Sequence, residues 1–292
     1  MSGQLRTLKN RIRSVENTKK ITKAMEMVAA AKLRRFQTLM VKGKAYADGL
    51  ENLLKRLSQG ENLIPHPLLE KREEKKTCVV LITSDTGLCG SYNLALIERA
   101  KHFLSGLPPA VLCGVGKMGA RALERLGLPC QRTFTNIRTS EIEQTLKDLI
   151  AYLQELYLER KVDAIYVVYS HCLSVTSFEE VTEKILPLEK PEGAEKTEKK
   201  GPGAASVDYI FEPDPETILK RLIPLFFEAR TRQVFLESFV SEQIARMRAM
   251  HQATENASEM IDSLVLLRNK VRQAAITKEI IEIVSGSQAL KT

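Results

Sequence analysis

The sequence contains no tryptophan, few aromatic residues and no long apolar run. Its apolar runs, such as Cys78 to Ile82, fall far short of the roughly 20 residues that a helix needs to cross a bilayer, and the N-terminus has no apolar signal core. We therefore expect a soluble protein that is not exported through a signal peptide. The content of 43% hydrophobic and 27% charged residues is ordinary for a folded chain, which excludes global disorder.

Cysteine and histidine are too few and too scattered to form a metal site. The five cysteines include no Cys-x-x-Cys pair and do not cluster with the four histidines. Zinc sites and disulfide frameworks need closely spaced ligands or an even set of cysteines. His66, His102 and His251 each stand alone among solvated residues. We expect a reduced, intracellular protein without a metal or a cofactor.

Glycine and proline are absent from two long stretches, residues 4–41 and 225–285. At 1.5 Å per residue an unbroken helix over the second stretch would span about 90 Å, far more than a helix of a globular domain. Between Leu236 and Ile281, apolar residues recur at alternating steps of three and four. A narrow apolar seam with this period requires a second helix wound around it with a left-handed twist. Three seam positions are polar: Gln243, Arg246 and Lys278.

The N-terminal stretch has the same spacing and is the expected partner. Its apolar positions are Leu5, Leu8, Ile12, Val15, Ala29, Leu33, Phe36 and Met40. Three residues break this seam: Lys19, Thr22 and Glu26. Three apolar residues lie on another face: Ile21, Met25 and Val28. We expect the N-terminal helix, within residues 1–60, to present that second face to something other than its partner helix.

Between the two helices the pattern changes to that of an α/β domain, residues 77–211. Short β-rich runs at 78–83, 110–113, 130–133 and 162–169 alternate with segments of helical spacing, which implies a sheet layered with helices. Further strands are expected at 175–181 and 207–211. Between them, residues 189–205 form a low-complexity loop rich in Glu, Lys, Gly and Pro.

The C-terminal helix, residues 214–286, is expected to begin with Asp214 as its N-cap and Pro215 as its first helical residue, and to kink at Pro224. The predicted fold class is an α/β domain combined with a long coiled coil. The N- and C-terminal helices form an antiparallel, left-handed coiled coil, and a Rossmann-like α/β domain is inserted between them.

One run has the spacing of a dinucleotide-binding loop. Gly114, Gly116 and Gly119 follow an expected strand and open an expected helix. However, residues 134–137 lack the acidic side chain that would hold a ribose, and the strand is the second of its domain rather than the first. A tight strand-to-helix turn is therefore favoured, and a dinucleotide-dependent oxidoreductase is retained as an alternative.

Two other runs invite a catalytic interpretation. Ser84 to Gly90 lacks the Lys-Ser/Thr ending of a P-loop, so a turn whose glycines adopt unusual dihedral angles is favoured. His171 and Cys172 are neighbours in an expected strand, where adjacent side chains point to opposite faces and cannot form a nucleophile–base pair. We expect no catalytic residue.

The positive charge is concentrated at the N-terminus. Residues 1–42 hold eleven Lys or Arg against Glu16 and Glu26, a net charge of +9. A basic stripe of this kind can contact nucleic acid, an anionic membrane or an acidic protein surface. The alternative function that follows is a basic coiled-coil protein that binds nucleic acid, with binding that weakens steeply as salt rises.

Several motifs together resemble the γ subunit of the F-type ATP synthase of bacteria, and the similarity covers the chain from Gln4 to Leu290. The matching stretches are Lys19–Lys32, Ser84–Gly90, Phe211–Pro215, Ser241–Met247, Arg272–Glu279 and Ile283–Gly286. The resemblance implies a non-catalytic central stalk, or rotor shaft, of a proton-translocating ATP synthase. It further implies three α and three β subunits, the ε subunit and the membrane c-ring as partners, with no nucleic acid. The implied location is the cytoplasmic face of the bacterial inner membrane, as a peripheral protein.

The resemblance also implies contact residues. Seven positions match those where the family's shaft meets the β subunits: Lys20, Lys23, Met25, Arg246, Gln273, Thr277 and Glu279. Phe211 and Glu212 match the foot that touches the c-ring. We expect these residues to couple rotation to ATP synthesis or hydrolysis, with Met25 on the off-seam face of its helix.

Overall fold

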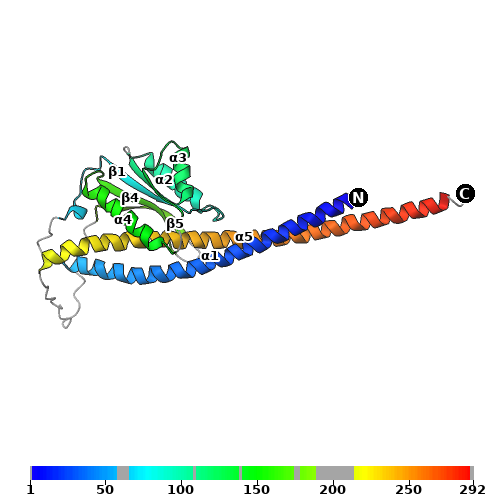
Figure 1. The fold of residues 1–292 in the computed structure, drawn as a ribbon, viewed down its shortest axis with the longest axis horizontal. Helices are drawn as coiled ribbons and strands as arrows, with labels where there is room; N and C mark the ends of the chain where they lie inside the picture. Colours follow the sequence, from blue (N-terminus) through cyan, green and yellow to red (C-terminus); the bar gives the residue numbers. More distant parts are fainter. Residues whose placement is uncertain are drawn as a thin grey trace, which may run out of the picture. The chain divides into compact units, whose positions relative to one another are not determined.

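A computed structural model describes residues 2–57, 66–107, 110–137, 140–173, 178–188 and 214–289 (Figure 1). The chain forms two compact units. The two-helix unit consists of Met1–Ala31 and Arg246–Thr292, and the α/β unit consists of Lys32–Ala245. Two long helices, α1 (Ser2–Leu57) and α5 (Pro215–Ala289), contribute to both units.

The α/β unit contains a sheet of mixed direction. Its strands are β1 (Thr77–Ile82), β2 (Ala110–Val115), β3 (Arg132–Phe134), β4 (Ala164–Cys172) and β5 (Phe178–Leu186). The order across the sheet is β3-β2-β1-β4-β5, and all neighbours are parallel except β4 and β5. The chain therefore builds outward from β1 to β3, then continues at β4 on the other side of β1, which is a doubly wound, Rossmann-like topology.

Helices cover the sheet on both faces (Figure 1). They are α2 (Tyr92–Leu104), α3 (Lys117–Arg125) and α4 (Ile142–Leu158), and a short 3-10 helix, η1 (Pro67–Leu69), precedes β1. Val79 and Leu81 of β1 pack with Leu96 of α2 and Leu123 of α3 in one buried cluster. Every residue of β1 is buried, as expected for a central strand with helices on both sides.

α1 and α5 are antiparallel within each unit. In the α/β unit, Phe36 stacks on Phe239 with ring centroids 5.6 Å apart. In the two-helix unit, the Lys19 ammonium group donates to the Ser258 hydroxyl and the Thr254 hydroxyl donates to Thr22. The residue numbers rise along α1 as they fall along α5, which confirms the expected antiparallel pairing.

Both long helices include the stretches that lack glycine and proline and extend beyond them. α1 continues past Gly43 and Gly49, and α5 continues through Pro224. Asp214 caps α5, because its carboxylate accepts from the Thr217 amide at 2.8 Å. β5 begins later than the predicted strand at 175–181. The predicted strand at 207–211 and the loop 189–205 lie outside the described residues.

Candidate coupling surface

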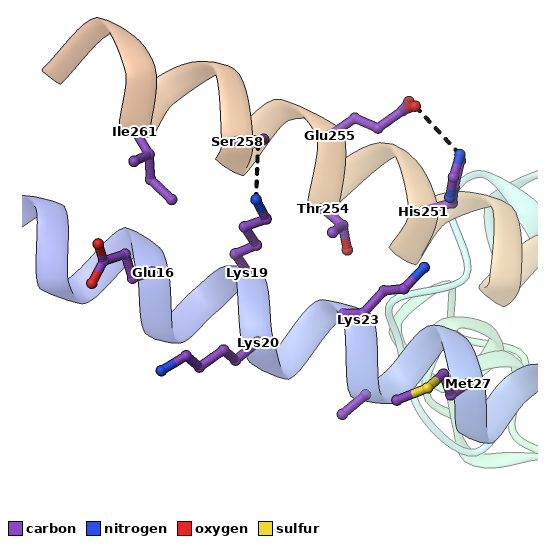
Figure 2. A pocket seen from close by; sticks show the side chains of 11 residues that line it. Glu16, Lys19, Lys20, Lys23, Met27, His251, Thr254, Glu255, Ser258 and Ile261 are labelled. Carbon is purple, nitrogen blue, oxygen red and sulfur yellow. Dashed lines mark hydrogen bonds and ion pairs between the residues drawn. The ribbon is translucent and has the colours of Figure 1, made fainter. Parts of the chain in front are cut away.

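A groove lies between α1 and α5 in the two-helix unit, with a cavity volume of about 910 Å³. The side chains that line it are shown in Figure 2: Glu16, Lys19, Lys20, Lys23, Ala24, Met27, His251, Thr254, Glu255, Ser258 and Ile261. Lys19 and Lys23 point toward α5, whereas Lys20 points away from it (Figure 2). The lining of the groove thus combines apolar side chains with three lysine amines.

The three polar breaks in the α1 seam all meet polar side chains of α5. Lys19 donates to the Ser258 hydroxyl at 2.9 Å. One helical turn further on, the hydroxyls of Thr22 and Thr254 are 2.8 Å apart. These contacts replace apolar packing with directional bonds, and a polar pair inside a helical interface fixes its register at some cost in stability.

The third break, Glu26, contacts two basic side chains, one on each helix. Its carboxylate accepts from the Lys23 ammonium group at 3.0 Å and lies 3.3 Å from His251 Nδ1. The hydrogen bond from Lys23 is the largest influence that lowers the pKa of Glu26, and His251 lowers it further. His251 also lies 3.4 Å from Glu255. The expectation that His251 stands isolated is therefore wrong, because the pairing of the helices brings Glu26 to it.

The predicted contact residues of α1 occupy two flanks of the helix. Lys20 and Lys23 line the groove. Met25 is absent from that lining and is 36% exposed, on a face that it shares with Ile21 and Val28 at helical spacings of three and four. The predicted second apolar face is thus present, and it is separate from the lysine-rich groove.

The predicted contact residues of α5 lie at two levels. Gln273, Thr277 and Glu279 are exposed near the C-terminal end of the helix, whereas Arg246 is only 9% exposed. At 1.5 Å per residue, Arg246 and Gln273 are roughly 40 Å apart along the helix, so they cannot belong to one contact. The predicted residues of α5 therefore lie at two separate levels of the two-helix unit. Phe211 and Glu212 lie outside the described residues.

Exposed apolar side chains gather near the C-terminal end of α5, and of these only Ile281 is a predicted seam position. The residues are Ile276, Ile280, Ile281, Ile283 and Val284. Predicted seam positions Leu267 and Ile281 are each about half exposed. The relative lengths of the two helices are the sequence signal for this exposed group. The two-helix unit takes residues 1–31 from the N-terminal part of the chain but 246–292 from the C-terminal part, so part of α5 has no α1 residues to pack against.

The glycine-rich run after β2 is a tight turn that the chain itself fills. Gly116 has a φ of 86°, and a Cβ there would lie 2.1 Å from the Thr83 carbonyl oxygen. The amides at the start of α3 are already bonded: that of Lys117 to Asp85, that of Met118 to the Ser84 carbonyl, and that of Gly119 to the Thr83 hydroxyl. A dinucleotide site needs these amides for its pyrophosphate. The favoured interpretation as a turn is confirmed, and the dinucleotide alternative loses its binding groups.

The loop after β1 ties neighbouring loops together rather than presenting a nucleophile. The Asp85 carboxylate accepts from the amides of Lys117 and Ile137, which follow β2 and β3. The left-handed residues of this loop are Leu88, with φ 65°, and Gly90, with φ 62°. The unusual dihedral angle predicted for the glycines thus falls on Gly90 and on a leucine.

The described cysteines in the sheet are poorly suited to thiol chemistry. Burial raises the pKa of Cys78 to about 12 and raises that of Cys113 well above its ordinary value. Burial also raises the pKa of Cys172, and the adjacent His171 instead contacts Glu237 of α5 at 2.6 Å. Since the thiolate is the reactive form, these residues fit a structural role. Among the described residues, no group of three His, Cys, Asp or Glu could hold a metal ion.

Comparison with known proteins identifies the family. The family model described as ATP synthase matches residues 4–290. An ATP synthase gamma chain of Moorella thermoacetica is 41% identical over 290 residues, covering 99% of this chain and all of the relative. The chain belongs to the γ-chain family of the F-type ATP synthase. A gamma chain of Heliobacterium modesticaldum is 38% identical and covers 98% of this chain and 99% of the relative.

Solved structures share the fold. A chain in the rotor of the Euglena gracilis mitochondrial ATP synthase superimposes with a TM-score of 0.64 at 19% identity, covering 94% of this chain and all of that one. A chain from the central stalk and c-ring of the Tetrahymena thermophila enzyme gives 0.56 at 24% identity, with 80% of this chain and 99% of that one covered. The predicted family, the fold class and the function as a non-catalytic central-stalk γ subunit are confirmed. Both alternatives, the nucleic-acid-binding coiled coil and the oxidoreductase, are set aside.

Proposed function

We propose that this γ subunit is the rotating shaft that couples proton flow to the catalytic sites of its ATP synthase. Its partners are three α and three β subunits, the ε subunit and the c-ring. Solved relatives support this, since one comes from the rotor and another from an assembly of F1 with the c-ring of the Euglena gracilis mitochondrial enzyme. The observation that carries the proposal is a full-length match to γ chains together with a two-helix unit whose flanks differ in chemistry.

Different flanks are what a rotary coupling element requires. One flank of the two-helix unit carries the amines of Lys20 and Lys23, another carries the apolar side chains around Met25, and the C-terminal part of α5 exposes further apolar side chains. Three chemically identical β subunits around such a shaft each meet a different surface. Each is then biased toward a different conformation, and rotation passes the three states around the ring.

The predicted contact residues are assigned to these different surfaces of the shaft. Lys20, Lys23 and Met25 act at one level of the shaft and Gln273, Thr277 and Glu279 at another, while Arg246 supports the first level from within the helix pair. Phe211 and Glu212 are proposed to contact the c-ring. We place the chain at the cytoplasmic face of a bacterial inner membrane as a peripheral subunit. No described helix is long and apolar enough to cross that membrane.

Met25→Lys tests the apolar flank. A cation at this exposed position adds an ion pair to an interface that must release at every step, so ATP-driven proton uptake should fall relative to ATP hydrolysis. The measurement is both rates in membrane vesicles. Val41→Lys is the matched control, because Val41 is also an exposed apolar residue of α1 but belongs to the α/β unit, outside the proposed contact levels. Proton uptake that keeps the parental proportion to hydrolysis in Met25→Lys would show that Met25 has no coupling role.

The assembly is tested first by isolation from native membranes. The tagged chain, extracted in mild detergent, should carry three α and three β chains per copy and show ATPase activity. Recovery of the chain alone, or with nucleic acid, would contradict the proposed function.

A further inference from the structure

Within the α/β unit, α5 is held to the α/β domain by side-chain links between Arg230 and Ser241, a rise of roughly 16 Å along the helix. We call these links the α5 anchor. They are Arg230 to Glu183 of β5, Arg232 to Glu143 of α4, Glu237 to His171 of β4, Ser238 to Tyr92 of α2, and Ser241 to the Ser170 carbonyl of β4. One stretch of helix is thus fastened to four elements.

Two links of the anchor are fully buried. The Tyr92 hydroxyl lies 2.9 Å from the Ser238 hydroxyl and 3.1 Å from the Ser238 carbonyl oxygen. The Ser241 hydroxyl donates to the Ser170 carbonyl at 3.0 Å. All four residues are at most 1% exposed. Hydrogen bonds that are shielded from water are directional and strong, so they resist both sliding and rotation of the helix.

The charged links add a network at the edge of the sheet. Arg230 donates twice to Glu183, at 2.6 and 3.1 Å, and the Tyr169 hydroxyl donates to the same carboxylate at 2.8 Å. Glu237 binds His171 and also accepts from Gln233 of its own helix at 3.0 Å. Two guanidinium N–H groups that meet one carboxylate oxygen, while Tyr169 holds the other oxygen, constrain orientation as well as distance.

α1 is attached in a different way. Its buried side chains in this unit are apolar and recur at helical spacing: Leu33, Phe36, Ala47, Leu50 and Leu54. Phe36 stacks on Phe239 of α5. For the described side chains of α1 in this unit, hydrogen bonds and ion pairs stay within the helix, as in Thr38 to the Arg34 carbonyl and Lys55 to Glu51. Apolar contacts are non-directional and permit one helix to shift against another.

We propose that torsional load passes between the α/β domain and the shaft through the α5 anchor, and that α1 is carried by α5. Tyr92 and Ser241 are then positioning residues for coupling, although they contact no catalytic site. This inference rests on the proposed function as a rotor. It goes beyond that function in assigning the load to one of the two helices and to a named set of side chains.

The test measures torsional stiffness in the assembled complex. The α3β3 hexamer is fixed to a surface, a bead is attached to the α/β domain through Lys101→Cys at an exposed position of α2, and the variance of the bead angle is recorded. The variant is Tyr92→Phe with Ser241→Ala, which removes two hydroxyl oxygens and adds no volume. Tyr157→Phe is the matched control, because its hydroxyl donates at 2.7 Å to the carbonyl of Glu70, a residue that precedes β1 and is not part of α5.

The double variant should raise the angular variance at least twofold and lower ATP-driven proton uptake per ATP, while Tyr157→Phe should leave both at the parental values. A variance that stays at the parental value in the double variant overturns the inference. An equal rise of the angular variance in Tyr157→Phe also overturns the inference, since the loss of stiffness would then not be specific to the α5 anchor. If the double variant fails to assemble, the same angular variance is measured in the single variant Tyr92→Phe, with the same expected rise. A parental bead that does not rotate with ATP contradicts the proposed function instead.

Discussion

At the residue scale, the backbone around Gly116 determines which side chain is possible. Gly116 has a φ of 86°, and a Cβ added there would lie 2.1 Å from the Thr83 carbonyl oxygen. A larger residue therefore cannot fit unless the backbone around Thr83 or the start of α3 moves. Gly116→Ala should therefore destabilise the chain by at least about 3 kcal/mol in urea unfolding. Gly127→Ala is the control, because Gly127 has a similar φ of 75° but open space around it. Its cost should be about 1 to 2 kcal/mol. Equal losses of unfolding free energy in both variants would show that the dihedral angle, and not the close contact with Thr83, causes the destabilisation.

Glu26 gives the helix pair a dependence on pH. Because Lys23 and His251 hold its pKa below the ordinary value, the ionised carboxylate favours the folded state above the unfolded pKa. That contribution is lost as pH falls through the lowered folded value. Glu26→Gln should lower the melting temperature of the purified chain by roughly 1 to 3 °C at pH 7, and the difference should shrink as pH falls below about 4.3, the ordinary pKa of a glutamate, and on through the lowered folded pKa. Glu16→Gln, on an exposed part of the same helix, is the control. A difference that persists at pH 3 would mean that packing, not charge, is responsible.

At the element scale, α1 tolerates two glycines without ending. The nearest atom to an added Cβ is Leu236 Cδ1 at 4.0 Å for Gly43, and nothing lies within 4 Å for Gly49. Alanine at each position should stabilise the chain by about 0.5 to 1 kcal/mol, since it restricts the unfolded chain and has a higher helix propensity. Urea unfolding of the single and double variants measures this. Destabilisation by Gly49→Ala would indicate that α1 must bend there.

The elements were predictable where one local signal was strong. Absence of glycine and proline predicted the central parts of α1 and α5, although both helices extend further, and the apolar run 78–83 predicted β1 within one residue. β5 was placed three residues too early, because it is an edge strand of mostly half-buried residues without clear alternation. The left-handed Leu88 was missed, since a leucine gives no sequence signal for that conformation.

At the scale of the whole molecule, sequence periodicity predicts which face of each helix is buried but not which residues meet. Lys19 and Ser258 are 239 positions apart, and Glu26 and His251 are 225 apart. The polar breaks in the α1 seam were visible, whereas their partners on α5 depend on a register that only the packed pair defines. For the same reason the α5 anchor has no local signature, because Tyr92 and Ser238 are ordinary residues until the fold joins them.

The two units should differ in stability because they differ in buried surface. In the two-helix unit the described buried side chains lie along a single seam: Ile12, Thr22, Ala29, Arg246, Met250, Ala257, Leu264 and Ala275. The α/β unit instead has a sheet buried on both faces. Amide hydrogen exchange of the isolated chain should therefore show protection at least about 100-fold lower in residues 5–30 and 248–285 than in β1 and β4. Binding to the α3β3 hexamer should raise the protection of the two-helix unit, because ligands that bind only the folded form stabilise it. Equal protection of both units in the isolated chain would mean that the helix pair is stable by itself. The polar residues in its seam would then reduce its stability very little.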